Sequence, residues 1–213
     1  MEDSYLELYD RISRVGQRYA RDSKIMSAPE ITKIVRRQFV SEIFRIETAR
    51  DPVVSPDMIV VAGFYDCYDD SQDLPCVTIA LTYSPQQEKY FTHLIDWEQL
   101  AFDVAEAVGH ELVHREQHHA QKKLRAYKSH STILVEKEDQ EYLGHEAEIE
   151  AYGFSIAFES WHKKIPVEVC PMFVTYVATF FDHDDKVLLK LQKYISKYLK
   201  QLEASSSCVT TKN

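Results

Sequence analysis

The stretch Val108-Gly109-His110-Glu111-Leu112-Val113-His114 carries two histidines four residues apart, with a glutamate directly after the first. Residues four apart lie on the same face of an α-helix, so His110 and His114 can present two imidazoles to one metal ion. Glu111 stands beside them, where its carboxylate can reach a water on that metal. Two nitrogen ligands, a third protein ligand, an open position and a base make up a catalytic zinc site. The stretch therefore predicts a helix that binds zinc as its cofactor.

The residues around this stretch predict a helix in the centre of the fold. Asp96-Trp97-Glu98-Gln99 has the form of a capping box, which predicts the start of a helix running to about Lys123. Between Leu100 and Val113 the apolar residues point in nearly all directions, and a helix that is apolar all round is buried. After His114 the sequence turns polar, so the helix is expected to emerge into solvent there.

The remaining pattern predicts a mainly α protein with a small antiparallel β-sheet, an α+β fold with the metal helix at its core. Two runs rich in β-forming residues, 58–65 and 76–83, are expected to pair as antiparallel strands. Residues 66–75 between them are expected to be a polar loop. The other expected helices cover residues 3–22, 27–48, 137–163, 172–181 and 182–204. The helix over 27–48 begins with a capping box at residues 27–30, and the helix over 172–181 is apolar enough to be buried. The lysines of the last helix are expected to form a solvated face. Residues 1–204 are expected to form one domain, and 205–213 a disordered tail.

The overall charge and the cysteines bear on location and partners. Acidic residues outnumber basic ones, 34 to 25, which argues against nucleic acid and anionic membranes as partners. Four scattered cysteines, none in a C-x-x-C pair, predict reduced thiols. We find no signal peptide at the N-terminus and no apolar stretch long enough to span a membrane. These features predict a protein of the cytoplasm, or one packaged from there into a virion; they predict no particular oligomeric state.

The third zinc ligand should come from the helix expected after the metal helix. Within the apolar stripe from Leu143 to Trp161, Glu150 points nearer the apolar centre than Glu148 does. A carboxylate inside such a stripe needs a partner, because burying a bare charge is costly. Glu148 and Glu150 are therefore both candidate ligands. His145 can orient Glu148 or touch a substrate.

Glu148-Ile149-Glu150-Ala151-Tyr152-Gly153-Phe154 resembles the second motif of small gluzincins such as the ImmA/IrrE-type peptidases, roughly E-x-x-A-N/D-x-F-A. The resemblance covers the two metal helices and extends to small metallopeptidase-like proteins of phages. It implies a zincin-like fold in which Glu148 is the third ligand. Tyr152 stands where the family usually has Asn or Asp, so the family's second-shell carboxamide or carboxylate is missing there. Glu150, His145 and Tyr152 are kept as alternative ligands or second-shell residues.

The resemblance implies a zinc-dependent, peptidase-like hydrolase that acts on a peptide or protein substrate. Zinc held by His110, His114 and Glu148 would activate a water, with Glu111 as general base. Tyr142, Tyr152 and His145 are candidates for the donor that stabilises the negative intermediate. In gluzincins, a strand placed like 76–83 forms the wall of the cleft and pairs with an extended peptide.

A second interpretation belongs to another class of protein. The same residues would suit a non-catalytic structural or interaction protein stabilised by metal, for example a phage virion component. A side chain such as His145 or Tyr152 in the fourth zinc position would close the site and indicate this class.

Overall fold

The computed structural model describes residues 3–121, 143–179 and 185–209. The chain divides into two compact units, Met1–Leu112 and Val113–Asn213. Helix α4 (Trp97–Gln121) begins in the first unit and continues into the second. The described chain is mainly helical with a small sheet, which confirms the expected fold class.

A three-stranded mixed sheet forms the β part of the first unit, in the order β2-β4-β3. The strands are β2 (Phe44–Arg50), β3 (Ile59–Tyr65) and β4 (Val77–Tyr83). β3 and β4 are antiparallel, so the pair predicted from the sequence is confirmed. β2 runs parallel to β4, which puts β4 in the centre of the sheet with a neighbour on each side.

The predicted helix over 27–48 is wrong in its second half. Helix α2 covers only Ala28–Arg36, and its first turn is capped by Glu30, whose carboxylate accepts from the N–H and the hydroxyl of Ser27 at 2.8 Å each. The segment that follows becomes β2, because its residues pair with β4 along their whole length and this pairing buries Ile46. The guanidinium of Arg36 donates to the carbonyl of Ile46, joining the end of the helix to the strand.

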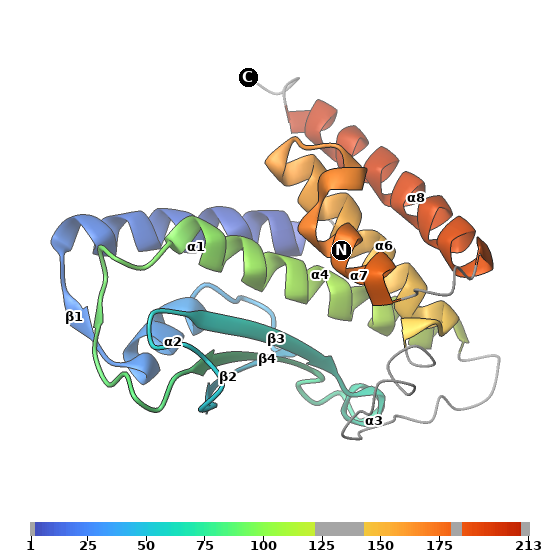
Figure 1. Cartoon of the computed structure of the whole chain (residues 1–213). Helices are drawn as coiled ribbons and strands as arrows, with labels where there is room; N and C mark the ends of the chain where they lie inside the picture. The colour runs from blue at the N-terminus through green and yellow to red at the C-terminus, as the bar shows by residue number, and fades with distance from the viewer. Residues whose placement is uncertain (1–2, 122–142, 180–184, 210–213) are drawn as a thin grey trace. The chain divides into compact units, whose positions relative to one another are not determined.

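Helices α1 (Asp3–Asp22) and α4 lie side by side on one face of this sheet (Figure 1). The bounds of α1 agree with the prediction, and Tyr19 stacks on Trp97 at the start of α4. Asp96 begins α4 as expected, since its carboxylate accepts from the N–H of Gln99 at 2.9 Å. Residues Leu100–Val113 are almost all buried, so α4 is the central helix that the sequence predicted.

Three small elements complete the first unit. β1 (Ile25–Met26) and β5 (Tyr90–Phe91) form an antiparallel pair. The short helix α3 (Cys67–Ser71) lies in the segment expected to be a polar loop, and Asp66 caps it. None of Cys67, Cys76 and Cys170 is in a disulfide.

The second unit contains α6 (Glu146–Lys163), the 3-10 turn η1 (Val167–Val169), α7 (Pro171–Thr179) and α8 (Asp185–Val209). α6 and α8 lie side by side along their length (Figure 1). They approach closely at Gly153, where an added Cβ would lie 2.5 Å from the Cβ of Tyr194. Glycine is therefore required there by the distance between the two helix backbones.

Three helix predictions in this unit need correction. The helix expected from 137 is interrupted at Gly144 and His145, because His145 caps the N-terminus of α6; residues 137–142 lie outside the described part. α7 was expected to be buried, yet Tyr176 is its one buried residue. α8 continues to Val209, so residues 205–209 of the expected tail are helical.

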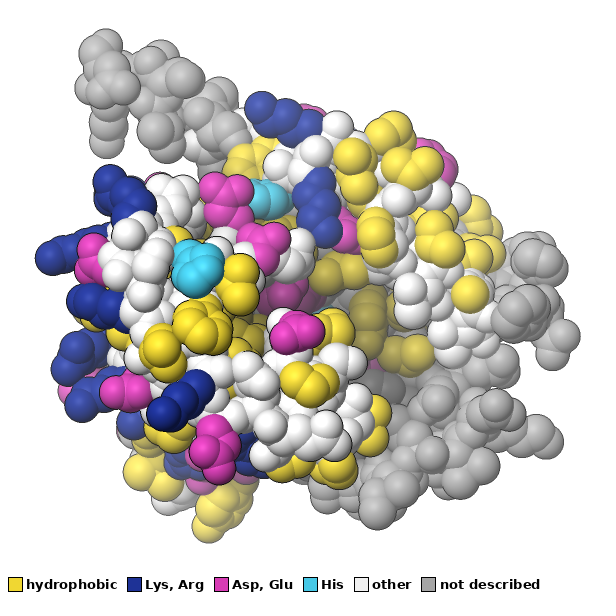
Figure 2. Space-filling model, turned by 60° about the vertical axis from the view of Figure 1, so that its left-hand side comes forward, with side chains coloured by type: hydrophobic (Ala, Val, Ile, Leu, Met, Phe, Trp, Pro, Cys, Tyr) yellow, Lys and Arg dark blue, Asp and Glu magenta, His cyan; other side chains and the backbone are white. Residues whose placement is uncertain are grey.

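The surface mixes charge types and some apolar side chains. On the face drawn in Figure 2, Lys and Arg side chains lie among Asp, Glu and hydrophobic side chains. Of the α8 lysines expected to be solvated, Lys190 pairs with Glu146 and Lys197 with Glu150. Among the described helices, none combines the length and the apolar character needed to cross a membrane.

Candidate metal centre

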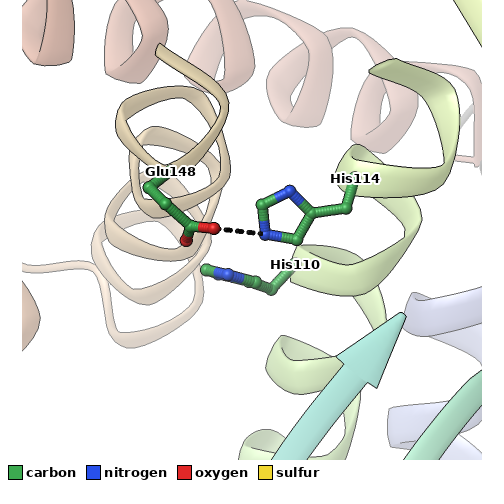
Figure 3. A group of neighbouring side chains, drawn as sticks. All are labelled: His110, His114 and Glu148. Carbon is green, nitrogen blue, oxygen red and sulfur yellow. Dashed lines mark ion pairs between the residues drawn. The ribbon is translucent and has the colours of Figure 1, made fainter. Parts of the chain in front are cut away.

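His110, His114 and Glu148 come together as a group that can hold a metal ion. One ligand atom from each lies within 4.8 Å of the others. The two histidines are one turn apart on α4, and Glu148 reaches them from the first turn of α6 (Figure 3). Of the two carboxylates considered from the sequence, the structure thus brings Glu148 to the histidines.

The distance between His114 and Glu148 is longer than a typical hydrogen bond and is compatible with an ion held between them. The Nε2 atom of His114 lies 3.4 Å from Oε1 of Glu148. Hydrogen bonds of this kind centre on about 2.9 Å. Two ligand atoms at about 2.0–2.1 Å from a tetrahedral zinc are separated by roughly 3.3 Å, which is close to the observed distance. Two imidazole nitrogens and one carboxylate oxygen are also a ligand set of catalytic zinc sites.

Burial strengthens the case for a cation. Glu148 is only 3 % exposed, whereas Glu146, two residues earlier on the same helix, is exposed. A buried carboxylate is costly unless positive charge and hydrogen bonds compensate it. A divalent ion held between Glu148 and the two histidines would supply that charge.

Glu111 is buried on α4 and packs against β3. It is 7 % exposed, and a Cβ added to Gly63 would lie 2.7 Å from its Cγ and 2.8 Å from its Oε1. The close approach of strand and side chain therefore depends on glycine at position 63. Sequence reasoning missed Gly63, although an isolated glycine inside a strand is a known sign of close approach.

Glu150, the other candidate ligand, has different partners. Its Oε2 accepts from the side-chain amide of Gln117 at 3.0 Å, and its Oε1 from Lys197 at 2.7 Å. Both carboxylates therefore reach α4, but Glu148 meets His114 whereas Glu150 meets Gln117. Glu150 lies in a hydrogen-bonded network next to the metal group.

His145 and Tyr152 have structural contacts. His145 is exposed, and its Nδ1 accepts from the N–H of Ala147 at 3.3 Å as the cap of α6. The half-buried ring of Tyr152 packs on Tyr176, with centroids 5.0 Å apart. Tyr142, the third candidate for the stabilising donor, lies outside the described residues.

Tyr176 is a neighbour of the site that the sequence analysis did not single out. Burial raises the pKa of its hydroxyl, and the nearby Tyr152 and Glu148 raise it further. The hydroxyl stays protonated and donates to the carbonyl of Leu143 at 2.6 Å. Tyr176 thus ties α7 to the residues just before α6.

The strand expected to receive a peptide is not available for pairing. That strand is β4, and the backbone on both of its sides is already paired, with β2 and with β3. A central strand cannot add another chain, so this prediction is wrong. Within the part of the chain that the structure describes, β3 stands at one edge of the sheet, and it packs against Glu111.

Comparison with known proteins adds no family to this picture. No family model, no curated protein and no solved structure matches the chain. Function must therefore be inferred from the residues and their geometry.

Proposed function

We propose that this chain is a zinc-dependent, peptidase-like hydrolase of the gluzincin type. The observation that supports it most directly is the group formed by His110, His114 and Glu148, with Glu111 next to His110 on the same helix. Two histidines and a glutamate leave a zinc ion at least one position for a water or a substrate. A carboxylate adjacent to the ligands supplies the base that such chemistry requires.

Each of the four residues has a separate task in this proposal. His110, His114 and Glu148 hold the ion, which when bound supplies a Lewis acid that polarises a water and a substrate carbonyl. Glu111 accepts a proton from the attacking water and then delivers it to the leaving amine. Its carboxylate is held for this task by burial and by contact with β3 at Gly63.

The position of β3 supports an extended peptide as the substrate. Among the described strands it stands at an edge of the sheet, and its side chains alternate between half-buried and exposed along the whole length from Ile59 to Tyr65. An extended peptide binds such an edge through main-chain hydrogen bonds, with alternate side chains entering pockets. We assign to β3 the substrate-binding role that the sequence had suggested for β4.

The first test is metal content, measured by mass spectrometry on protein purified without added metal. We expect one zinc per chain in wild type, loss of zinc in Glu148→Ala, and zinc retained in Glu111→Gln. A wild-type protein that takes up no zinc even when zinc is supplied would rule out the proposal.

The second test is hydrolysis of a mixed peptide library, followed by mass spectrometry. Wild type should cleave peptides, and Glu111→Gln should cleave them at least about 10²-fold more slowly because the general base is lost. Equal cleavage by the two proteins would contradict the role of Glu111. Zinc bound tightly in a wild type that cleaves nothing would favour the alternative, a structural or interaction protein stabilised by metal.

A further inference from the structure

The second ring nitrogen of His114 has a defined partner on its own helix. Nδ1 of His114 lies 3.2 Å from Oε1 of Gln117, one turn further along α4. The other ring nitrogen, Nε2, faces Glu148. Both nitrogens of this imidazole are therefore placed by neighbouring side chains.

The orientation of the Gln117 amide follows from what its other end contacts. Its Nε2 lies 3.0 Å from the carbonyl oxygen of Ala147 and 3.0 Å from Oε2 of Glu150. A carbonyl and a carboxylate can only accept hydrogen bonds, so this end of the amide must be the NH₂ group. The end that faces His114 is then the oxygen, which can only accept.

This orientation selects one form of the His114 ring. Because Gln117 can only accept there, Nδ1 of His114 must carry the proton. In a neutral imidazole, Nε2 is then left with its lone pair, and Nε2 is the atom that points toward Glu148. The network thus prepares the tautomer that a metal ion requires.

Glu150 is held in its accepting role by α8. Lys197 donates to its Oε1 at 2.7 Å, and the hydroxyl of Tyr198 lies 3.3 Å from the same atom. The Glu150 side chain is 17 % exposed, so the ion pair with Lys197 is partly shielded from solvent. The ammonium of Lys197 can only donate, so Glu150 accepts from α8 through Oε1 while its Oε2 accepts from Gln117.

We propose that Gln117, anchored by Glu150, is the positioning residue that fixes His114 as the Nδ1–H tautomer and directs its Nε2 to the metal. The inference rests on the metal site of the proposed function and adds the residues that orient it. It also assigns a task to Glu150, which the sequence presented as a rival ligand. Removing the outer partner of a ligating histidine typically weakens metal binding about 10- to 100-fold.

Zinc affinity, measured by competition with a chromophoric chelator, provides the first readout. Gln117→Leu removes the acceptor and should weaken zinc binding about 10- to 100-fold. Gln99→Leu is the matched control, since it makes the same substitution on α4 at a glutamine that bonds Asp103. It should leave the affinity unchanged. Equal affinity in wild type and Gln117→Leu would overturn the proposal.

Two variants of Glu150 separate an anchor from a ligand. Glu150→Gln keeps a side-chain oxygen that can accept from Gln117, so it should bind zinc nearly as wild type does. Glu150→Leu removes that acceptor and should weaken binding in the same direction as Gln117→Leu. Complete loss of zinc in Glu150→Gln would show a direct ligand and contradict the anchoring role.

The tautomer of the His114 ring can be determined directly by ¹H–¹⁵N NMR of the imidazoles. The measurement uses metal-free protein at a pH above the range in which histidine is protonated. We expect a protonated Nδ1 and an unprotonated Nε2 for His114 in wild type and in Gln99→Leu, and a mixture of tautomers in Gln117→Leu. A wild-type His114 protonated on Nε2 would overturn the inference. This readout needs no zinc, so it stands apart from a failure of the metal site itself.

Discussion

At the scale of single residues, the candidate general base depends on a glycine in another element. Glu111 is buried on α4, and β3 passes so close to it that a Cβ at position 63 would overlap its Cγ and Oε1. The three atoms nearest to such a Cβ all belong to Glu111. We therefore expect a substitution at position 63 to move the base before it moves the metal ligands.

Gly63→Ala tests this expectation. The added methyl group should push the Glu111 side chain aside, because an approach of 2.7 Å to its Cγ is too short for two carbons. A displacement of about 1 Å can lower turnover by about 10²-fold. We expect that loss in peptide cleavage, with one zinc per chain retained. Thr48→Val, at an exposed position of β2 outside the proposed peptide-binding strand, should cleave normally; unchanged cleavage in Gly63→Ala would contradict the packing argument.

At the scale of elements, charged pairs join α6 to α8. Glu146, in the first turn of α6, accepts from Lys190 and from the hydroxyl of Tyr194, the latter at 2.7 Å. Further along, Glu150 accepts from Lys197. The hydrogen bond from Lys190, and then that from Tyr194, lower the pKa of Glu146. The two helices are thus joined partly through groups that titrate.

Glu146→Gln should make this contribution visible as a function of pH. A carboxyl whose pKa is lowered by folding stabilises the folded state above its unfolded pKa of about 4.3, and the stabilisation is lost as the pH falls through the folded value. The side chains of Glu146 and Lys190 are each 51 % exposed, so solvent screening limits the effect to about 0.5 kcal/mol.

Urea unfolding of wild type and Glu146→Gln between pH 7 and pH 3 measures this contribution. Wild type should be more stable at neutral pH, and the difference should vanish at the acid end. Glu203→Gln, an exposed position on α8, is the control and should show no such trend. A difference that is constant across this pH range would exclude ionisation of Glu146 as its cause.

At the scale of the whole molecule, a bound metal should couple to the stability of the fold. His110 and His114 are one turn apart on α4, and Glu148 lies in the first turn of α6. These three candidate ligands come together only in the folded chain. An ion that binds the folded state alone stabilises it by about 2.7 kcal/mol when its free concentration is 100 times the dissociation constant.

Metal removal therefore predicts a lower melting temperature. Adding a strong chelator to wild type should lower the Tm measured by calorimetry, and returning zinc should restore it. His110→Ala lacks one ligand, so its Tm should be lower from the start and insensitive to the chelator. A wild-type Tm unaffected by metal removal would show that any bound ion contributes nothing to folding.

The sequence alone determined the features whose cause is local. The spacing of His110 and His114 is a property of any helix, so the pair could be predicted without knowing the fold. The apolar character of residues 100–113 predicted a buried helix, and it is buried. The antiparallel pair β3–β4 followed from β-forming residues on both sides of a loop. The capping motifs marked the starts of α2 and α4 for the same local reason.

Only the tertiary structure decided the features that depend on distant partners. Residues 44–50 form a strand because they pair with β4 along their whole length. This pairing outweighs the helical spacing of the apolar residues in the segment. Whether Glu148 or Glu150 meets the histidines depends on how α6 is rotated by its contacts with α8, including Gly153 against Tyr194. The spacing of apolar residues placed Glu150 nearer than Glu148 to the centre of the apolar face. That spacing gives only the mean direction of the face, whereas the direction of a single ligand side chain is set by its specific contacts.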